Sequence, residues 1–365
     1  MKKVIIAGGG TGGHLYPGIS VAREIKRRTP DADILFVGVP WGIEAKVVPA
    51  EGFPLRCLKV KGLAGMGVGA KVKALSLLLP AVIEAKEIIR EFRPDAVIGL
   101  GGYSSAPLLM AAVMKKIPSL VMEQNVVPGI TNRLLGQVVR RVAVSFEASM
   151  AAFPAGRAVH TGNPVRSEMG TVERRAARTT LGLEPERFTL LVFGGSRGAR
   201  SINAAMRQAA PMLAAMKDRL QIVHQTGSDI STKEVEEAYG AAGIRCMART
   251  YIYQMAEAYA AADLVVCRSG ASTVTELAVC GRASILVPYP FAAGNHQEFN
   301  ARTLEEKGAA RCILDAAISG GDLLAREITS LMDDDAGRHA MEVASLSLAR
   351  KDATARVVDE LERLA

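Results

Sequence analysis

Hydrophobic residues along the chain fall into short aliphatic runs, and longer stretches with helical spacing of apolar and polar residues lie between these runs, as at residues 18–28 and 81–92. Short buried strands that alternate with amphipathic helices are typical of parallel βαβ units. The pattern therefore predicts an α/β protein. Ten runs are expected to form strands, five in each half of the chain: residues 4–7, 34–37, 96–100, 119–123, 141–145, 189–193, 222–225, 244–247, 264–267 and 284–287.

The strand–helix pattern starts again after a turn at residues 161–166, which reads TGNPVR. Gly, Asn and Pro together favour a turn, here a hinge between domains. A chain of 365 residues is also too long for one ordinary hydrophobic core. We therefore expect an N-terminal domain over residues 1–162 and a C-terminal domain over residues 163–340. The last segment, residues 341–365, has a helical pattern and is expected to pack back on the first domain.

Each half opens with a strand that runs into a glycine-rich loop, GGGTGGH at residues 8–14 and GGSRGA at residues 194–199. Two more loops of this kind follow strands at residues 101–105 (GGYSS) and 268–270 (RSG). A glycine turn between a strand and a helix lets an anion approach the backbone and the positive helix N-terminus. Ligands bind at this end of a parallel sheet. The loops predict a substrate that carries phosphate.

The glycines Gly8, Gly10 and Gly13 also match the dinucleotide-binding fingerprint. That fingerprint requires an acid at the end of the second strand, to bind the ribose. Here the strand ends in Gly-Val-Pro, and the nearest acid, Glu44, lies well past it. NAD is therefore disfavoured, and the missing Gly-Lys-Ser/Thr disfavours NTP hydrolysis.

Composition narrows the class of protein further. The chain is 49% hydrophobic and 22% charged, as globular proteins are, and its net charge of +8 favours anionic partners. No nucleic-acid module is apparent, so nucleic acid is not an expected partner. Five scattered cysteines without a CxxC pair favour reduced thiols in a cytoplasm over a zinc site. The apolar runs are too short for a signal peptide or a membrane span. The acidic run at residues 333–335 is interpreted as a solvated turn rather than a metal site.

Some side chains have two interpretations. His14 follows the first glycine loop, where it could transfer a proton or contact phosphate, although a single histidine is usually structural. Glu276 could accept hydrogen bonds from a sugar diol or be a surface carboxylate. One group of basic and apolar residues could dock on acidic lipid or belong to a buried helix with snorkelling lysines. This group comprises Lys71, Lys73, Leu75, Leu79, Lys115, Lys116, Arg140 and Arg141.

Taken together, the motifs resemble those of one family. The three N-terminal motifs are GGGTGGH, GLGGYSSAP from residue 99 and EQN from residue 123. They are followed by GNPVR from 162, GGSRGA from 194, RSGA from 268 through Thr275 and Glu276, and HQ at 296 through Asn300. In this order, over nearly the whole chain, they resemble the bacterial MurG family of N-acetylglucosaminyltransferases. These enzymes transfer GlcNAc from UDP-GlcNAc to lipid I, which gives lipid II for peptidoglycan.

The resemblance implies a GT-B fold, in which two Rossmann-like parallel-sheet domains face a deep cleft, with the acceptor mainly on the N-terminal domain and UDP-GlcNAc mainly on the C-terminal one. It implies no cofactor and no metal. It implies a peripheral protein on the cytoplasmic face of the inner membrane, with other cell-wall enzymes as partners. The acceptor diphosphate would contact Gly10, Thr11, Gly101, Gly102, Tyr103 and Ser104. The donor would contact Thr11, Gly12, Gly13, Asn125, Arg166, Gly195, Ser196, Ile252, Ala271, Ser272, Thr273, Glu276 and Gln297.

The implied reaction is inverting transfer to the C4 hydroxyl of MurNAc in lipid I, undecaprenyl-pyrophosphoryl-MurNAc-pentapeptide. We expect His14 to be the general base and hold Glu123 in reserve. This chain departs from the family's pattern at two positions. Met122 stands where members often have His, and His296 replaces a Gln found in some members. Both departures bear on the contacts to the sugar. Two rival functions stay open: a UDP-GlcNAc epimerase of the same fold, and a noncatalytic scaffold for cell-wall assembly.

Overall fold

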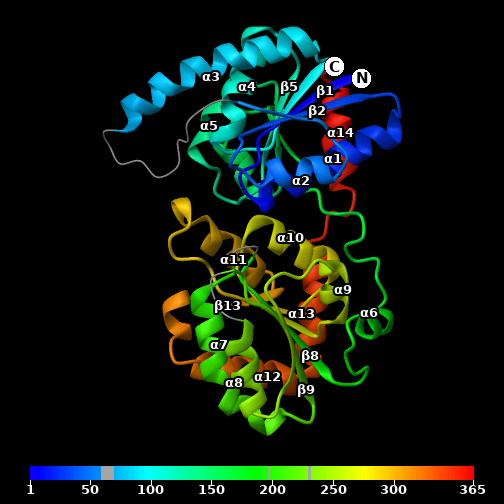
Figure 1. Ribbon diagram of the computed structural model, residues 1–365, viewed down its shortest axis with the longest axis vertical. Coiled ribbons are helices and arrows are strands. Elements are labelled where there is room, and N and C mark those ends of the chain that lie inside the picture. Colours follow the sequence, from blue (N-terminus) through cyan, green and yellow to red (C-terminus); the bar gives the residue numbers. More distant parts are fainter. Residues whose placement is uncertain (59–69, 196–197, 229–231) are drawn as a thin grey trace. The chain divides into compact units, whose positions relative to one another are not determined.

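In a computed structural model the chain folds into two compact units. Unit 1 comprises Met1–Arg166 and Arg350–Ala365, and unit 2 comprises Ser167–Ala349. The structure describes residues 1–58, 70–195, 198–228 and 232–365, apart from the side chains of residues 70–78. Each unit contains one parallel sheet with helices on both faces (Figure 1). The prediction of two parallel-sheet α/β domains is confirmed.

The sheet of unit 1 has seven strands in the order β3-β2-β1-β4-β5-β6-β7. The strand order reverses between β1 and β4, and ligands bind beside such a switch point in open α/β sheets. The loops that follow β1 and β4 lie there, because parallel strands all end at the same edge. The strands are β1 (Lys3–Ala7), β2 (Asp33–Gly38), β3 (Leu55–Cys57), β4 (Ala96–Gly99), β5 (Ser119–Glu123), β6 (Arg141–Val144) and β7 (Ala158–His160).

Two hydrophobic clusters, one on each face, cover this sheet. The strands are apolar on both faces, as buried parallel strands must be. The last helix lies beside the first (Figure 1), and Arg28 in the first donates to Asp359 in the last at 2.7 Å. The helices of unit 1 are α1 (Gly12–Arg28), α2 (Glu44–Ala50), α3 (Ala70–Phe92), α4 (Ala106–Met114), α5 (Ile130–Leu135) and α14 (Ala353–Glu362), with 3-10 turns η1 (Tyr103–Ser105) and η2 (Glu147–Ala152).

Unit 2 repeats the plan with six parallel strands in the order β10-β9-β8-β11-β12-β13. Its switch point lies between β8 and β11, where the loops at residues 194–199 and 268–270 follow. The strands are β8 (Phe188–Phe193), β9 (Leu220–Gln225), β10 (Arg245–Arg249), β11 (Leu264–Cys267), β12 (Ser284–Leu286) and β13 (Ala310–Cys312). The helices are α6 (Arg174–Thr180), α7 (Arg200–Leu213), α8 (Thr232–Ala241), α9 (Met255–Ala261), α10 (Ala271–Cys280), α11 (His296–Glu306), α12 (Asp322–Asp333) and α13 (Asp335–Ser347), with 3-10 turns η3 (Ala214–Met216), η4 (Ala293–Asn295) and η5 (Asp315–Ile318).

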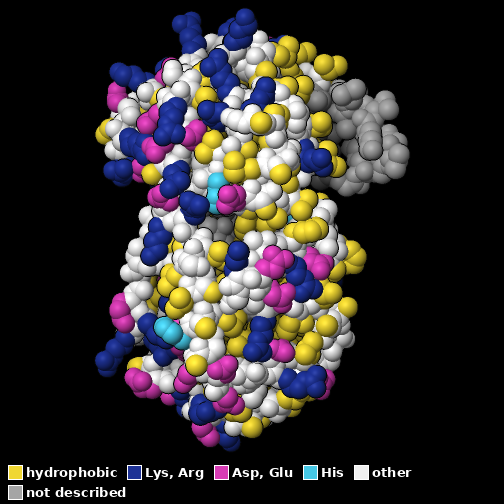
Figure 2. Space-filling model, turned by 180° about the vertical axis from the view of Figure 1, so that it is seen from behind, with side chains coloured by type: hydrophobic (Ala, Val, Ile, Leu, Met, Phe, Trp, Pro, Cys, Tyr) yellow, Lys and Arg dark blue, Asp and Glu magenta, His cyan; other side chains and the backbone are white. Residues whose placement is uncertain are grey.

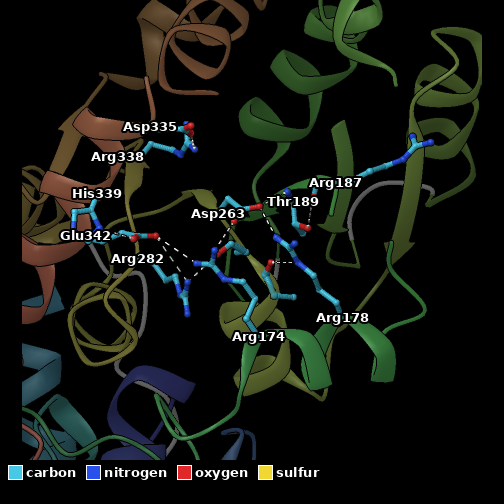
Figure 3. A network of polar contacts seen from close by, with 12 residues as sticks. Arg174, Arg178, Arg187, Thr189, Asp263, Arg282, Asp335, Arg338, His339 and Glu342 are labelled. Carbon is cyan, nitrogen blue, oxygen red and sulfur yellow. Dashed lines mark hydrogen bonds and ion pairs between the residues drawn. The ribbon is translucent and has the colours of Figure 1, made fainter. Parts of the chain in front are cut away.

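Asp263, at the start of β11, joins three elements of unit 2 at the edge opposite the glycine loops (Figure 3). Its carboxylate accepts from Arg178 at 2.6 Å, from Arg174 at 2.9 Å and from the Thr189 amide at 2.7 Å. These bonds fix α6 against β8 and β11. Because the carboxylate is mostly buried and its charge is balanced by two guanidinium groups, we assign it a structural role.

The structure differs from the expected elements in three respects. Helix α1 begins at Gly12, six residues before the predicted start, because it continues through Pro17. The strands β3, β7 and β13, each of three residues at an edge of its sheet, were not predicted. The helical pattern at the chain's end is broken: α13 belongs to unit 2, and only the part from Arg350 onward belongs to unit 1. Within the described ranges, no helix is both long and apolar enough to span a bilayer.

Candidate active site

The first glycine loop connects β1 to α1 with three consecutive residues at positive φ: Gly8 at 116°, Gly9 at 153° and Gly10 at 78°. Side-chain-bearing residues rarely adopt these angles. A Cβ on Gly8 would also lie 3.2 Å from the Gly101 carbonyl oxygen, so this loop packs directly on the loop that follows β4. Glycine is therefore needed here both for the turn and for the close approach of the two loops.

Glu44 reaches this loop, which the sequence pattern did not indicate. The carboxylate accepts from the Gly10 amide at 2.8 Å and from the Val39 amide at 2.9 Å, and the residue is 0% exposed. Burial removes it from any ribose, which agrees with the exclusion of NAD. It also occupies the Gly10 amide, so in this structure that amide already has a hydrogen-bond acceptor.

Thr11 and His14 form a pair at the start of α1. Thr11 Oγ1 lies 3.0 Å from His14 Nδ1, and Thr11 precedes the helix as its N-cap residue without a capping bond from its side chain. Thr11 and Gly13 are exposed, whereas Gly12 and His14 are half-buried. The imidazole thus contacts a hydroxyl at the glycine-rich edge of the sheet.

Two side chains hold the loop after β4 through hydrogen bonds to backbone carbonyls. The Gln124 side-chain amide donates to the Leu100 carbonyl at 3.0 Å, and the buried Ser105 hydroxyl donates to the Gly102 carbonyl at 2.9 Å. Gly101 and Gly102 have φ values of 91° and 74°. Tyr103 is 62% exposed, and Ser104 beside it is half-buried. Of the expected acceptor-binding residues of this loop, Gly101 is buried, Gly102 and Ser104 are half-buried, and Tyr103 is exposed.

Glu123, the reserve base, ends β5 with its carboxylate buried. One oxygen accepts from the Asn125 amide at 2.8 Å, and the other accepts from Asn132 Nδ2 at 2.8 Å and from the Gly129 amide at 3.2 Å. Burial raises the pKa of Glu123 above its ordinary value, while these donors oppose the rise. A buried carboxylate that accepts from two backbone amides and one side-chain amide holds the loop that carries Asn125.

The glycine loop of unit 2 follows β8 and is held by Gln225. Its side-chain NH2 donates to the Gly195 carbonyl at 2.9 Å, and its carbonyl oxygen accepts from the Ile252 amide at 2.8 Å. The Ile252 backbone is thus placed beside this loop, with its N–H already used. Gly198 has φ of 79° and a Cβ there would lie 2.2 Å from the Thr226 carbonyl oxygen. Ser196, the expected diphosphate contact, lies outside the described residues.

Helix α10 follows the loop after β11, and β11 is the neighbour of β8 in the sheet. Its N-cap is Gly270, which has no side chain to cap the first amides, and the first turn contains Ala271, Ser272 and Thr273. Glu276 follows one turn later, half-buried, and its carboxylate accepts from the Tyr259 hydroxyl at 3.0 Å. Four of the expected donor contacts therefore come from consecutive turns of one helix.

Gln297 in α11 and Arg268 after β11 organise the same edge of unit 2. The Gln297 side-chain oxygen accepts from the Tyr289 amide at 3.0 Å, and its backbone carbonyl accepts from the Ser269 hydroxyl at 2.7 Å. Arg268 donates to the Val287 and Pro288 carbonyls and forms an ion pair with Asp315. The buried Arg268 belongs to a sequence motif, but only the structure shows that it ties the loops together.

Arg166 is the last residue of the first segment of unit 1, and its guanidinium stacks over the Tyr16 ring of α1 at 5.5 Å. A cation over an aromatic face is held in place without losing its charge. Arg166 is therefore ordered beside α1, in the same unit as the His14 loop.

The predicted lipid-facing group is partly changed by the structure. Leu79 is 67% exposed, and Lys115, Lys116 and Arg140 are exposed, whereas the side chains of Lys71, Lys73 and Leu75 lie outside the described residues. Arg141 does not belong to the group, because its guanidinium binds the Gly156 carbonyl at 2.5 Å and Glu360 of α14 at 3.3 Å.

The three carboxylates of the acidic run at residues 333–335 each have a separate protein partner. Asp333 pairs with Arg219, Asp334 caps α13 through the Gly337 amide at 2.8 Å, and Asp335 pairs with Arg338. In the part of the chain that the structure describes, no group of three or more His, Cys, Asp or Glu side chains could hold a metal ion.

Two family models match this chain. The glycosyltransferase family 28 N-terminal domain matches residues 4–144, and the glycosyltransferase family 28 C-terminal domain matches residues 189–357. Together they include all four glycine-containing loops described above. A solved UDP-GlcNAc 2-epimerase from Neisseria meningitidis superimposes with a TM-score of 0.72 at 11% identity over the full length of both chains. At that identity the likeness shows the shared GT-B fold alone.

The similarity to transferases is much greater. The UDP-N-acetylglucosamine–N-acetylmuramyl-(pentapeptide) pyrophosphoryl-undecaprenol N-acetylglucosamine transferase of Thermodesulfovibrio yellowstonii is 43% identical over 362 residues, 99% of this chain and 98% of the relative. The crystal structure of Acinetobacter baumannii MurG superimposes with a TM-score of 0.79 at 30% identity and covers 100% of both chains. These findings favour transfer over epimerisation and over a noncatalytic scaffold. The chain belongs to glycosyltransferase family 28 and, within it, to the MurG N-acetylglucosaminyltransferases.

Proposed function

We propose that this enzyme transfers GlcNAc from UDP-GlcNAc to the C4 hydroxyl of MurNAc in lipid I, with inversion at the anomeric carbon and with His14 as general base. The hydrogen bond between Thr11 Oγ1 and His14 Nδ1 supports this role most directly. For Nε2 to take up a proton, the neutral ring must carry its hydrogen on Nδ1, and the Thr11 hydroxyl then accepts it. The contact with Thr11 is therefore compatible with the tautomer that a base requires.

In the proposed step the C4 oxygen attacks the anomeric carbon from the face opposite UDP. A bond forms between that oxygen and the anomeric carbon, and the bond from the anomeric carbon to the diphosphate oxygen breaks. The hydroxyl proton passes to His14 Nε2, and the electron pair of the broken bond stays on UDP. General base catalysis of this kind contributes about 100- to 10,000-fold to the rate.

The donor is assigned to the loops of unit 2. The amides at the start of α10 and in the Gly195 loop are suited to the diphosphate, because helix N-termini present unpaired N–H groups to anions. Arg166 adds a cation, and Ser196, Ser272 and Thr273 add hydroxyls. Such fixed donors stabilise the charge that develops on the leaving group.

The nucleoside and the sugar are assigned to four further residues. Glu276, oriented by Tyr259, would accept from the ribose hydroxyls. Since the Ile252 amide is already bonded, its carbonyl is assigned to the uracil N3–H. Asn125 and Gln297 would reach the GlcNAc group. The acceptor diphosphate is assigned to Thr11, Gly101, Gly102, Tyr103 and Ser104, without the Gly10 amide.

We further propose that unit 1 docks on the cytoplasmic face of the inner membrane. On the face that Figure 2 shows, this unit has both hydrophobic side chains and many Lys and Arg side chains at its surface. Leu79 and Ile83 of α3 are 67% and 60% exposed. Helix α4 contacts both α3 and α5. Around these helices the exposed apolar residues are Leu79, Ile83, Met114, Ile130, Leu134 and Val138, and the exposed basic residues include Lys115, Lys116, Arg133 and Arg140.

Vesicle binding tests the membrane proposal. The protein is expected to bind vesicles that contain anionic phospholipid, less strongly at high salt, because apolar insertion and charge attraction act together. The double variant Leu79→Glu, Ile83→Glu should lose binding, while Val343→Glu, at an exposed apolar position of unit 2, should retain it. Equal binding by all three proteins would contradict the proposal. Contacts with other cell-wall enzymes stay a prediction.

The reaction itself is tested by incubating the protein with UDP-GlcNAc, with and without a lipid I analogue. UDP release that requires the analogue is expected. Release or epimerised sugar without the analogue, or no turnover in either case, would contradict the proposed reaction.

Two substitutions separate the candidate bases. His14→Ala should lower kcat by about 100-fold or more and leave UDP affinity unchanged, as loss of a base predicts. Glu123→Gln should keep kcat within about tenfold and lower the melting temperature, because Glu123 braces a loop. Near-normal turnover of His14→Ala across pH would remove the role given to His14.

A further inference from the structure

Glu44 is a buried carboxylate in unit 1 that the proposed chemistry does not use. It is the first residue of α2, and its side chain turns back to accept the Val39 and Gly10 amides. Among the described residues, no Lys or Arg forms an ion pair with it. Two N–H donors and the start of a helix therefore hold a charge that is 0% exposed.

Three glycines form the walls of the space that Glu44 fills. A Cβ would lie 2.6 Å from Glu44 Oε2 at Gly9, 2.5 Å from its Cγ at Gly38 and 2.1 Å from Oε2 at Gly42. Atoms this close cannot coexist, so the backbone is shaped around this side chain from three sides. Gly9 comes from the loop after β1, Gly38 is the last residue of β2, and Gly42 comes from the turn that follows.

The bond from Gly10 to Glu44 lies one residue before the catalytic pair. Gly10 is held from the buried side, and Thr11, the next residue, is exposed and holds the His14 ring. At Gly10 the φ of 78° and the bond to Glu44 together set where the chain enters α1. The orientation of Thr11, and with it that of His14, is therefore linked to the Glu44 carboxylate.

We propose that Glu44 is a positioning residue for the transfer reaction: as an internal anion it orders the glycine loop at residues 8–13 and thereby sets the Thr11–His14 pair. This inference rests on the role proposed for His14. A carboxylate suits this position because both of its oxygens accept. A glutamine of the same shape would direct its NH2 group at one of the two backbone N–H groups and leave that donor unsatisfied.

Kinetics of Glu44→Gln provide the first test. With the full-length enzyme, UDP-GlcNAc and a lipid I analogue, kcat/KM for the analogue should fall about tenfold or more. The affinity for UDP, measured by calorimetry, should stay within twofold. Glu51→Gln, at the end of the same helix in an ion pair with Arg23, is the matched control and should change neither. Equal losses in analogue kinetics and UDP affinity would indicate general destabilisation and overturn the proposal.

The ring of His14 provides a second readout that does not depend on turnover. In protein with ¹⁵N-labelled histidine, assigned with His14→Gln, the His14 ring of the wild type should show the Nδ1–H tautomer. Glu44→Gln should shift it toward a mixture, and Glu51→Gln should not. Unchanged His14 signals in Glu44→Gln would overturn the proposal. If the wild type lacked acceptor-dependent turnover, the proposed function would fail while this measurement still decided whether Glu44 orients His14.

A third variant guards against failure of Glu44→Gln to fold. Glu44→Asp keeps the charge but shortens the side chain by one methylene, so its carboxylate reaches the two amides less well. It should give an intermediate loss of kcat/KM for the analogue and an intermediate shift of the His14 ring signals. Wild-type values for both, in folded Glu44→Asp, would show that contact with the amides is not needed and would overturn the proposal.

Discussion

The glycine loops of the two units follow equivalent strands but are braced by different chemistry. In unit 1 the brace is a buried carboxylate, Glu44, that accepts from the Gly10 amide. In unit 2 it is a neutral amide, Gln225, that donates to the Gly195 carbonyl. Behind Gln225 stand further neutral groups, since His224 bonds to Asn203 at 3.0 Å and to Tyr239 at 2.9 Å. One loop therefore already contains an anion, and the described part of the other is supported without one.

This difference bears on which loop binds a diphosphate. A carboxylate behind the backbone amides opposes the positive potential that glycine loops present to phosphate, because like charges repel across a poorly screened interior. The loop of unit 2, to which we assign the leaving UDP, has no such carboxylate among the described residues that brace it. The loop of unit 1 is better suited to hold Thr11 and His14 in place than to bind an anion tightly.

The largest expected effect comes from giving the second loop the brace of the first. Gln225→Glu places a negative charge beside Gly195 and removes the donor to its carbonyl, so UDP affinity should fall about 100-fold, or about 2.7 kcal/mol. Isothermal titration with UDP measures it. Gln208→Glu, an exposed change of equal charge on α7, should leave the affinity unchanged. Similar affinity in all three proteins would show that the charge of the brace does not matter.

A smaller effect is expected in the dependence of stability on pH, and it comes from His224, one of the neutral groups behind Gln225. Burial lowers the pKa of His224 to about 3, against about 6.5 in an unfolded chain. Between these values the unfolded chain binds more protons, so the free energy of unfolding falls as pH falls. From pH 7 to pH 5 the loss is about 2 kcal/mol.

Denaturant unfolding of the wild type and of His224→Gln at both pH values measures this effect. The variant lacks the titrating group, so its stability should change less between pH 7 and pH 5. His339→Gln, which alters a surface histidine of α13, should retain the wild-type dependence. The same dependence in all three proteins would mean that the His224 site is not held neutral.

The smallest effect concerns the pair in unit 1. Thr11→Val removes the hydroxyl at His14 Nδ1 without removing a helix cap, since the Thr11 side chain makes no capping bond. We expect kcat to fall about tenfold and UDP affinity to stay constant. Thr11→Ser, which restores the hydroxyl, should recover most of the rate. If valine and serine behaved alike, the hydroxyl would not orient His14.

Sequence patterns were sufficient for the architecture and for the positions of the glycine loops. Aliphatic runs identify the central strands because parallel strands are buried on both faces, and glycine clusters mark the turns that follow them. The motif resemblance identified the family, which the comparisons confirm. The strands β3, β7 and β13 at the sheet edges were missed, because they are short and only partly buried, whereas the equally short β12 is fully buried and was predicted.

The braces of the site could not be predicted, because each depends on where a side chain returns in space. Glu44 lies 34 positions after Gly10 and bonds to it only because β1 and β2 are neighbours in the sheet. Arg141 illustrates the reverse: its charge suggested a lipid contact, but α14, from the far end of the chain, supplies its partner Glu360. Local sequence specifies the loops, and the tertiary fold specifies which side chains brace them.

Helix α14 also bears on the order in which the protein can fold during synthesis. Its Val357, Val358 and Leu361 are buried in the core of unit 1, alongside residues of β1 and α1. Domains commonly fold in the order in which they leave the ribosome. Here unit 2 is contiguous and is complete after Ala349, whereas unit 1 lacks part of its core until α14 emerges. The unit whose synthesis begins first is therefore the one whose core is completed last.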